Sequence, residues 1–409
     1  MTNDLQSTMP TALFVAYGGG HIGSLLPVAA VLRDSGWRVH VLALTTAFKY
    51  AKAQGWEPLG FKDFLTPADD PALLFADSLV GNDATDLVPL EESRAYLGLS
   101  YLDLVGERGE EDAARAYAQK GRQAFLPVAT MRRILKRLRP DVLITTASPR
   151  AEYAAQLAAD ELGIKRVILL DLPDAYMVDR VASVAAGACV CVADRLSREM
   201  LLQRGVDDAY IRVAGNPAFD SLHAVSQQAI TDYRAKAGVA EDGALVVWAS
   251  QPEPTMHPAT GEVGNPDLPA EIETALRQWA SGREKDRLVV RYHPSEARDF
   301  YVSPNTGFSS RADDLSVLLN ACDALVTMTS TVAIQAAALG KRVVSVDLSV
   351  FSRDLPLVEL GISRGVTSLD SLPMVLESVL EEARVPGDSV ADSGRAADFV
   401  ADVIKNMFV

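Results

Sequence analysis

Short apolar runs alternate with longer helical segments along almost the whole chain. Each run is rich in β-branched residues and is followed by a small or polar turn and then by a stretch with helical periodicity. This alternation is typical of parallel sheets covered by helices on both faces, so the sequence predicts an α/β protein. The nine candidate strands are 12–19, 37–44, 141–147, 165–171, 188–193, 243–250, 286–292, 323–329 and 342–348.

The chain of 409 residues is too long for one compact core, and its strand–helix series divides near VAGNPAFDSL (213–222). We therefore predict two Rossmann-like, doubly wound parallel-sheet domains, 1–215 and 216–390, facing a cleft. Residues 391–409 are predicted to form a terminal helix that packs back on the first domain. The acidic stretch 64–109 is predicted to be an irregular excursion.

Charge and composition exclude several functions. The net charge of −15 opposes nucleic-acid binding, which needs clustered Lys and Arg. Three cysteines fit a reducing compartment, and neither an apolar run of membrane-spanning length nor a secretory signal pattern is found. We expect a cytoplasmic protein without cofactor or metal, with at most peripheral membrane contact through the basic cluster 131–140.

The first motif is AYGGGHIGSLLPVAAVL (16–32), a strand that ends in glycines before a helix. At Gly19 and Gly20 a ligand can approach the backbone near the helix N-terminus. His21 in this turn is suited to act as a general base, although a simple helix cap is an equal alternative. The glycines also match a dinucleotide pattern, but the next strand ends without the required acidic residue, so hydride transfer is a poor interpretation.

Polar residues follow three strands of the second half. These can bind an anion such as a phosphate, and for the hydroxyl cluster the alternative is an ordinary helix cap. The predicted group comprises Ser250, Gln251, Arg291, His293, Pro294, Thr329, Ser330 and Thr331.

Three further residues of the first half are candidates. Asp171 and Asp174, in LLDLPDAY (169–176), follow a strand and are interpreted as a base or as partners of His21. Asn216 lies at the domain boundary, where ligand contact competes with a hinge or cap role. The acidic pair Asp69–Asp70 is interpreted as solvated loop charge.

The order of these motifs resembles that of nucleotide-sugar glycosyltransferases with the GT-B fold. The His293-Pro294 pair followed by the hydroxyl cluster is similar to motifs of bacterial sialyltransferases, Kdo transferases and CDP-glycerol transferases, which bind a cytidine nucleotide and its phosphate. Gln335 stands where many UDP-sugar transferases have a glutamate, which favours a cytidine-type donor over UDP. UDP-N-acetylglucosamine 2-epimerases share the fold, but LLDLPDAY replaces their acidic motif.

The resemblance implies a metal-independent inverting glycosyltransferase. His21, or else Asp171 or Asp174, would deprotonate a hydroxyl of a glycan, lipid or small-molecule acceptor, and the polar groups of the second half would bind the nucleotide sugar. Two alternatives stay open: an enzyme like the 2-epimerases, and a catalytically silent binding subunit with the same fold.

Overall fold

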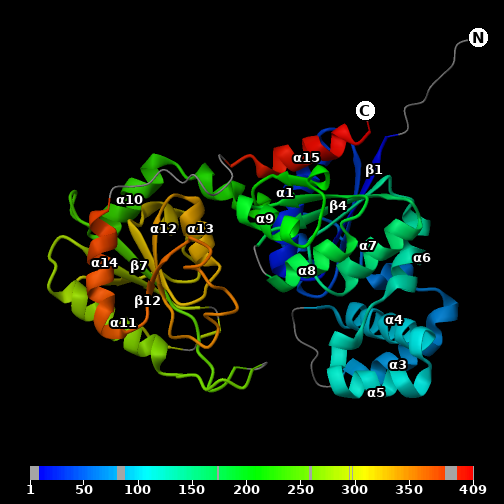
Figure 1. Cartoon of the computed structure of the whole chain (residues 1–409), viewed down its shortest axis with the longest axis horizontal. Coiled ribbons are helices and arrows are strands. Elements are labelled where there is room, and N and C mark those ends of the chain that lie inside the picture. The colour runs from blue at the N-terminus through cyan, green and yellow to red at the C-terminus, as the bar shows by residue number, and fades with distance from the viewer. Residues whose placement is uncertain are drawn as a thin grey trace, which may run out of the picture. The chain divides into compact units, whose positions relative to one another are not determined.

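The structure is a computed structural model that describes residues 9–80, 88–172, 175–257, 260–293, 295–296, 298–382 and 394–408. The chain divides into two compact units (Figure 1). Unit 1 comprises Met1–Ala218 and Arg395–Val409, and unit 2 comprises Phe219–Gly394. Each unit contains a six-stranded parallel sheet, which confirms the prediction of two doubly wound α/β layers.

The sheet of unit 1 has the order β2-β1-β3-β4-β5-β6. Its strands are β1 (Thr11–Ala16), β2 (Arg38–Ala43), β3 (Val142–Thr145), β4 (Lys165–Leu170), β5 (Ala188–Val192) and β6 (Ile211–Val213). From β1 the chain moves outward to β2 and then returns to the opposite side of β1 at β3. The strand order therefore reverses between β1 and β3, and the carboxyl ends of strands at such a reversal are where doubly wound sheets bind ligands.

Helices cover both faces of this sheet because the side chains of its buried strands are apolar on both faces. Phe14 faces α1 and α15, whereas Leu13 and Val15 face the side of α6 and α7. Figure 1 shows α15 beside α1. Val400 and Ile404 of α15 belong to the same hydrophobic core as Leu25 of α1. The helices are α1 (Gly19–Asp34), α2 (Thr46–Ala53), α6 (Val128–Leu138), α7 (Ala151–Glu161), α8 (Ala175–Val184), α9 (Arg195–Gln203) and α15 (Ala396–Asn406).

The segment predicted to be irregular is largely helical in its described part, so that prediction is wrong. It contains α3 (Asp70–Val80) and α4 (Leu90–Arg108) in full, and α5 (Glu110–Lys120) follows. Helix α4 is buried on several sides, so it has no one-sided apolar stripe to reveal it. Gly98 lets α3 and α4 approach closely, because a Cβ there would lie 2.4 Å from the Ala72 carbonyl oxygen.

The interpretation of Asp69 as a solvated charge is also wrong. Its side chain is buried and pairs with Arg133, whose Nη1 lies 2.7 Å from Oδ1. The Thr66 amide and hydroxyl both donate to Oδ2 at 2.8 Å. Against the effect of burial, these hydrogen bonds hold the pKa of Asp69 below its ordinary value.

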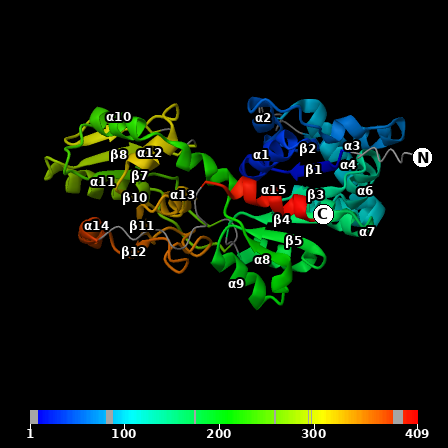
Figure 2. The ribbon, with the colours of Figure 1, turned by 90° about the horizontal axis from the view of Figure 1, so that it is seen from above.

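Unit 2 repeats the architecture with the order β12-β11-β10-β7-β8-β9, which reverses between β7 and β10. Helices α10 and α12 lie together on one face (Figure 2), and α11 and α14 pack on the other. The strands are β7 (Leu245–Ala249), β8 (Arg287–Arg291), β9 (Thr306–Phe308), β10 (Ala324–Thr327), β11 (Arg342–Val346) and β12 (Arg364–Val366). The helices are α10 (Gln227–Ala237), α11 (Leu268–Ser281), α12 (Leu315–Ala321), α13 (Val332–Ala338) and α14 (Leu372–Glu381).

Short 3₁₀ helices complete the description: η1 (Phe61–Phe64), η2 (Pro67–Asp69), η3 (Gly121–Ala124), η4 (Asp208–Tyr210), η5 (Pro217–Ala224) and η6 (Leu369–Ser371). None of the described helices combines the length and the apolarity that a membrane span requires.

Candidate functional site

The reversal of strand order in unit 1 brings the glycine turn after β1 beside the residues that follow β3. Gly19 and Gly20 begin α1, and the Gly19 amide donates to the Thr46 hydroxyl at 3.0 Å. His21 stands in the first turn of α1 and is partly exposed. Its Nδ1 lies 2.9 Å from the hydroxyl oxygen of Thr146, which immediately follows β3. One hydrogen bond therefore crosses the point where the strand order reverses.

Glu152, on α7, lies behind this contact. Its side chain is fully buried, and Oε2 lies 2.5 Å from the Thr146 hydroxyl oxygen and 2.8 Å from the Thr146 amide. Oε1 accepts a 2.8 Å hydrogen bond from the Tyr17 amide at the end of β1. Burial raises the pKa of Glu152, and the nearby charge of protonated His21 opposes this shift.

Asp171 follows β4 and is held by residues from α1 and from the segment after β6. The Ser24 hydroxyl lies 3.2 Å from Asp171 Oδ2 and 3.1 Å from Asn216 Oδ1. Asn216 donates from Nδ2 to the Asp171 carbonyl oxygen at 3.1 Å. Burial raises the pKa of Asp171, while the charge of His21 and the Ser24 hydrogen bond lower it. Asn216, predicted to touch a ligand, thus contacts Asp171 and Ser24 within unit 1.

In unit 2 a pair of hydrogen bonds crosses the corresponding reversal of strand order. Gln251, after β7, donates from Nε2 to the Thr329 hydroxyl at 2.6 Å and accepts from the Thr329 amide at 3.1 Å. Ser250 donates its hydroxyl to Glu296 Oε1 at 2.9 Å, and the other oxygen of Glu296 accepts from the His293 amide at 2.8 Å. These contacts join the loops after β7, β8 and β10 at one edge of the sheet.

The remaining predicted residues have more local contacts. Arg291 directs Nη1 to the Ser309 hydroxyl at 2.9 Å and to the Asp313 carbonyl at 3.1 Å, so this nitrogen is engaged within its own unit. Ser330 Oγ accepts from the Val332 amide at 3.3 Å, and Thr331 precedes α13. Asp174 and Pro294 lie outside the described residues.

The sequence analysis missed four polar residues at these sites: Ser24, Thr146, Glu152 and Glu296. Thr146 had a recognisable signal, because it follows a strand predicted to lie in the sheet. Glu152 had a weaker one, since it is an acidic residue in the first turn of an alanine-rich helix. Ser24 had none, because its partners lie 147 and 192 positions away in the chain.

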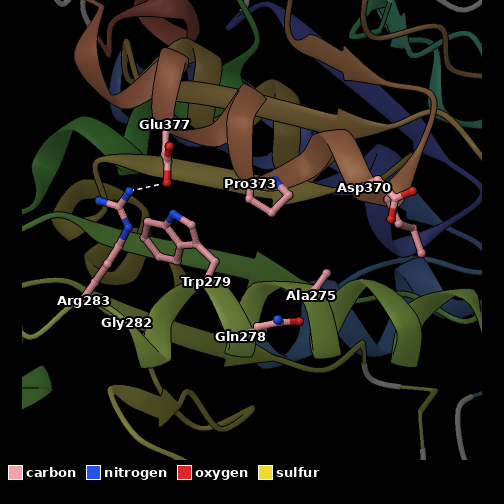
Figure 3. A pocket seen from close by; sticks show the side chains of 9 residues that line it. Ala275, Gln278, Trp279, Gly282, Arg283, Asp370, Pro373 and Glu377 are labelled. Atoms are coloured by element: carbon pink, nitrogen blue, oxygen red, sulfur yellow. Dashed lines mark hydrogen bonds and ion pairs between the residues drawn. The ribbon is translucent and has the colours of Figure 1, made fainter.

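A separate pocket of about 750 Å³ lies in unit 2 between α11 and α14. Figure 3 shows Trp279 at its wall beside the ion pair of Arg283 and Glu377. Its described lining contains none of the residues that the sequence analysis selected. Among the described residues, no group of three or more His, Cys, Asp or Glu side chains is placed to hold a metal ion.

Comparison with known proteins identifies the fold. No family model matches the sequence, and no curated protein matches it. Among solved structures, the UDP-GlcNAc 2-epimerase of Methanocaldococcus jannaschii has a TM-score of 0.58 and 12% identity, covering 98% of this chain and 100% of its own. The enzyme of Neisseria meningitidis bound to UDP-GlcNAc has a TM-score of 0.57 and 12% identity, covering 97% and 100%.

Glycosyltransferases share the fold with lower scores. The spinosyn rhamnosyltransferase has a TM-score of 0.50 and 15% identity, covering 98% of this chain and 97% of its own. The fold is therefore the GT-B architecture that nucleotide-sugar enzymes use. The higher scores of the epimerases overturn the interpretation of the chain as an inverting glycosyltransferase with a cytidine-type donor, and they favour the epimerase alternative.

Proposed function

We propose that the chain is a nucleotide-sugar epimerase of the UDP-N-acetylglucosamine 2-epimerase type. Two lines of argument support this proposal. The epimerase structures match nearly the full length of both chains, and some of them contain UDP-GlcNAc or UDP. The carboxyl edge of the unit 1 sheet also holds two groups of different chemistry, the His21 imidazole and the Asp171 carboxyl.

This pair of groups is the observation that carries the proposal, because inversion at C2 needs both a proton acceptor and a proton donor. The C2–H bond must break and a new one must form on the opposite face of the sugar. The electron pair of the C2–H bond forms a C1=C2 double bond while the C1–O bond breaks and its own pair leaves with the diphosphate, since the ring has no carbonyl beside C2. When the diphosphate oxygen adds back to C1, C2 takes a proton on the opposite face. In the proposed direction His21 accepts the proton, and Asp171, whose pKa is raised by burial, supplies the new one.

The nucleotide contacts are proposed for unit 2. Ser250, Gln251 and Thr329 place hydroxyl and amide groups at the carboxyl edge of the sheet, where ligands of doubly wound sheets bind. Ser330 and Thr331 extend this polar edge. Such neutral donors fit a diphosphate in a protein whose net charge is −15.

The test is incubation of the full chain with UDP-GlcNAc in deuterated water. We expect formation of the C2 epimer, UDP-N-acetylmannosamine, with deuterium at C2, detected by proton NMR and mass spectrometry. The variants His21→Gln and Asp171→Asn should each slow turnover by roughly 10²–10⁴-fold. His40→Gln is the matched control, because His40 lies within β2, away from the carboxyl ends of β1 and β3. Absence of both the epimer and deuterium incorporation would refute the proposal.

A further inference from the structure

We propose that Glu152 is a positioning residue that acts through the Thr146 hydroxyl. It fixes the proton of the neutral His21 imidazole on Nδ1, so that the lone pair of Nε2 is available to a substrate. This inference rests on the proposed function for its catalytic meaning. The geometry behind it is a continuous chain of hydrogen-bonded atoms, from a carboxylate with no exposed surface to a partly exposed histidine.

The direction of each hydrogen bond follows from counting protons. Glu152 receives three donors on two oxygens: the amides of Tyr17 and Thr146 and the hydroxyl of Thr146. Two backbone amides donate to Glu152, and these hydrogen bonds favour its ionised form against the effect of burial. An ionised carboxylate only accepts hydrogen bonds, and a hydroxyl has one proton to give. The Thr146 proton therefore points to Glu152, and its oxygen must accept from His21. That bond requires a proton on Nδ1.

This tautomer matters for proton transfer. With Nδ1 protonated, a base at His21 must act through Nε2, and the described hydrogen bonds of the ring involve only Nδ1. When Nε2 takes a proton, the imidazolium keeps its Nδ1–H bond to Thr146, and the buried carboxylate behind it stabilises the new charge. Glu152 would thus hold the ring in orientation and raise its affinity for a proton.

A purely structural role for Glu152 is the competing explanation, since the carboxylate also ties β1 to β3 through two backbone amides. The variant Thr146→Val separates the two explanations. It removes only the hydroxyl and keeps the amide that binds Glu152. Thr146→Ser is the matched control, because it retains the hydroxyl at the same position.

The readout is the tautomer of His21, measured by nitrogen-15 NMR on the full chain labelled at its five histidines, without substrate. The variant His21→Gln assigns the signal by its loss. We expect Nδ1–H in the wild type and in Thr146→Ser. In Thr146→Val we expect a shift toward Nε2–H, the form that a histidine prefers in water. Epimerisation by Thr146→Val should fall by roughly 10–100-fold in kcat with little change in KM.

Two results would overturn the inference: an Nε2–H tautomer in the wild type, or an unchanged Nδ1–H tautomer in Thr146→Val. If circular dichroism shows that Thr146→Val does not fold, the inference is still tested by the wild type and Thr146→Ser. Both must then have the Nδ1–H tautomer, and an Nε2–H tautomer in either would overturn the inference. The NMR measurement needs no turnover. A chain with the expected tautomers but no epimerisation would therefore refute the proposed function alone.

Discussion

Two glycines of the same helix should respond in opposite ways to replacement by alanine. Gly98 and Gly106 both lie in α4, but a Cβ at Gly98 would be 2.4 Å from the carbonyl oxygen and 2.9 Å from the carbonyl carbon of Ala72. These are backbone atoms of α3, so the two helices would have to separate. At Gly106 nothing lies within 4 Å of the added atom.

The expected magnitudes follow from two terms. Replacing glycine by alanine inside a helix stabilises it by about 0.5–1 kcal/mol, and this term is similar at both positions. Overpacking a close contact costs about 1–3 kcal/mol and applies only at Gly98. Gly106→Ala should therefore be stabilising, and the difference in free energy of unfolding between the two variants should be about 1–3 kcal/mol, because the helical term cancels.

Hydrogen exchange of peptides from α4, followed by mass spectrometry, measures this difference without assuming that the two units unfold together. Peptides from α10 in unit 2 serve as an internal reference and should exchange equally in both variants. Equal protection of α4 in Gly98→Ala and Gly106→Ala would refute the argument that α3 and α4 depend on a glycine at their crossing.

Three further predictions concern carboxylates whose pKa values are shifted. Burial raises the pKa of Glu92 to about 7, so the folded chain retains a proton that the unfolded chain loses. The free energy of unfolding should thus fall by about 3 kcal/mol as the pH rises from the ordinary glutamate pKa of 4.5 to about 7. Urea titrations of Glu92→Gln should no longer show this pH dependence. Asp69→Asn should lower the free energy of unfolding by about 1–3 kcal/mol. The same change at its exposed neighbour, Asp70→Asn, should alter the free energy of unfolding by less than about 0.5 kcal/mol. Equal shifts of the urea midpoint in the two variants would contradict the burial argument. Because the pKa of Asp69 is lowered, its stabilising contribution should be present above the ordinary pKa and should be lost as the pH falls through the lowered one. Ser24→Ala removes a hydrogen bond that lowers the pKa of Asp171, so the decline of the epimerisation rate at high pH should shift to a higher pH. A decline at the same pH would show that Asp171 is not the acid.

The strands that sequence reasoning found differ physically from those that it missed. Each of the nine predicted runs contains a strand of four to six residues, except that β1 begins one residue before its run. The three missed strands, β6, β9 and β12, have three residues each and lie at the edges of their sheets. So short a segment has no readable periodicity, and it becomes a strand because the neighbouring strand supplies hydrogen bonds along one side.

The site shows the same division between local and distant information. The positions of His21, Asp171 and Gln251 after strands could be read from the sequence, since parallel strands end at one edge of their sheet. The partners of His21 and Asp171 could not be inferred in this way. Thr146 lies 125 positions from His21, and Asn216 lies 192 positions from Ser24. Their meeting depends on the register and order of the strands between them.

By itself the sequence determined the class of fold and the edge of each sheet where chemistry is possible, because apolar periodicity and turn residues act over a few positions. Tertiary structure decided which groups meet there. It placed Glu152 behind Thr146, hydrogen-bonded Asp171 to Ser24 and Asn216, and turned the acidic stretch before Gly109 into packed helices. The physical reason is that burial and hydrogen bonding between distant segments set the protonation of these groups, and such contacts exist only after the sheets have assembled.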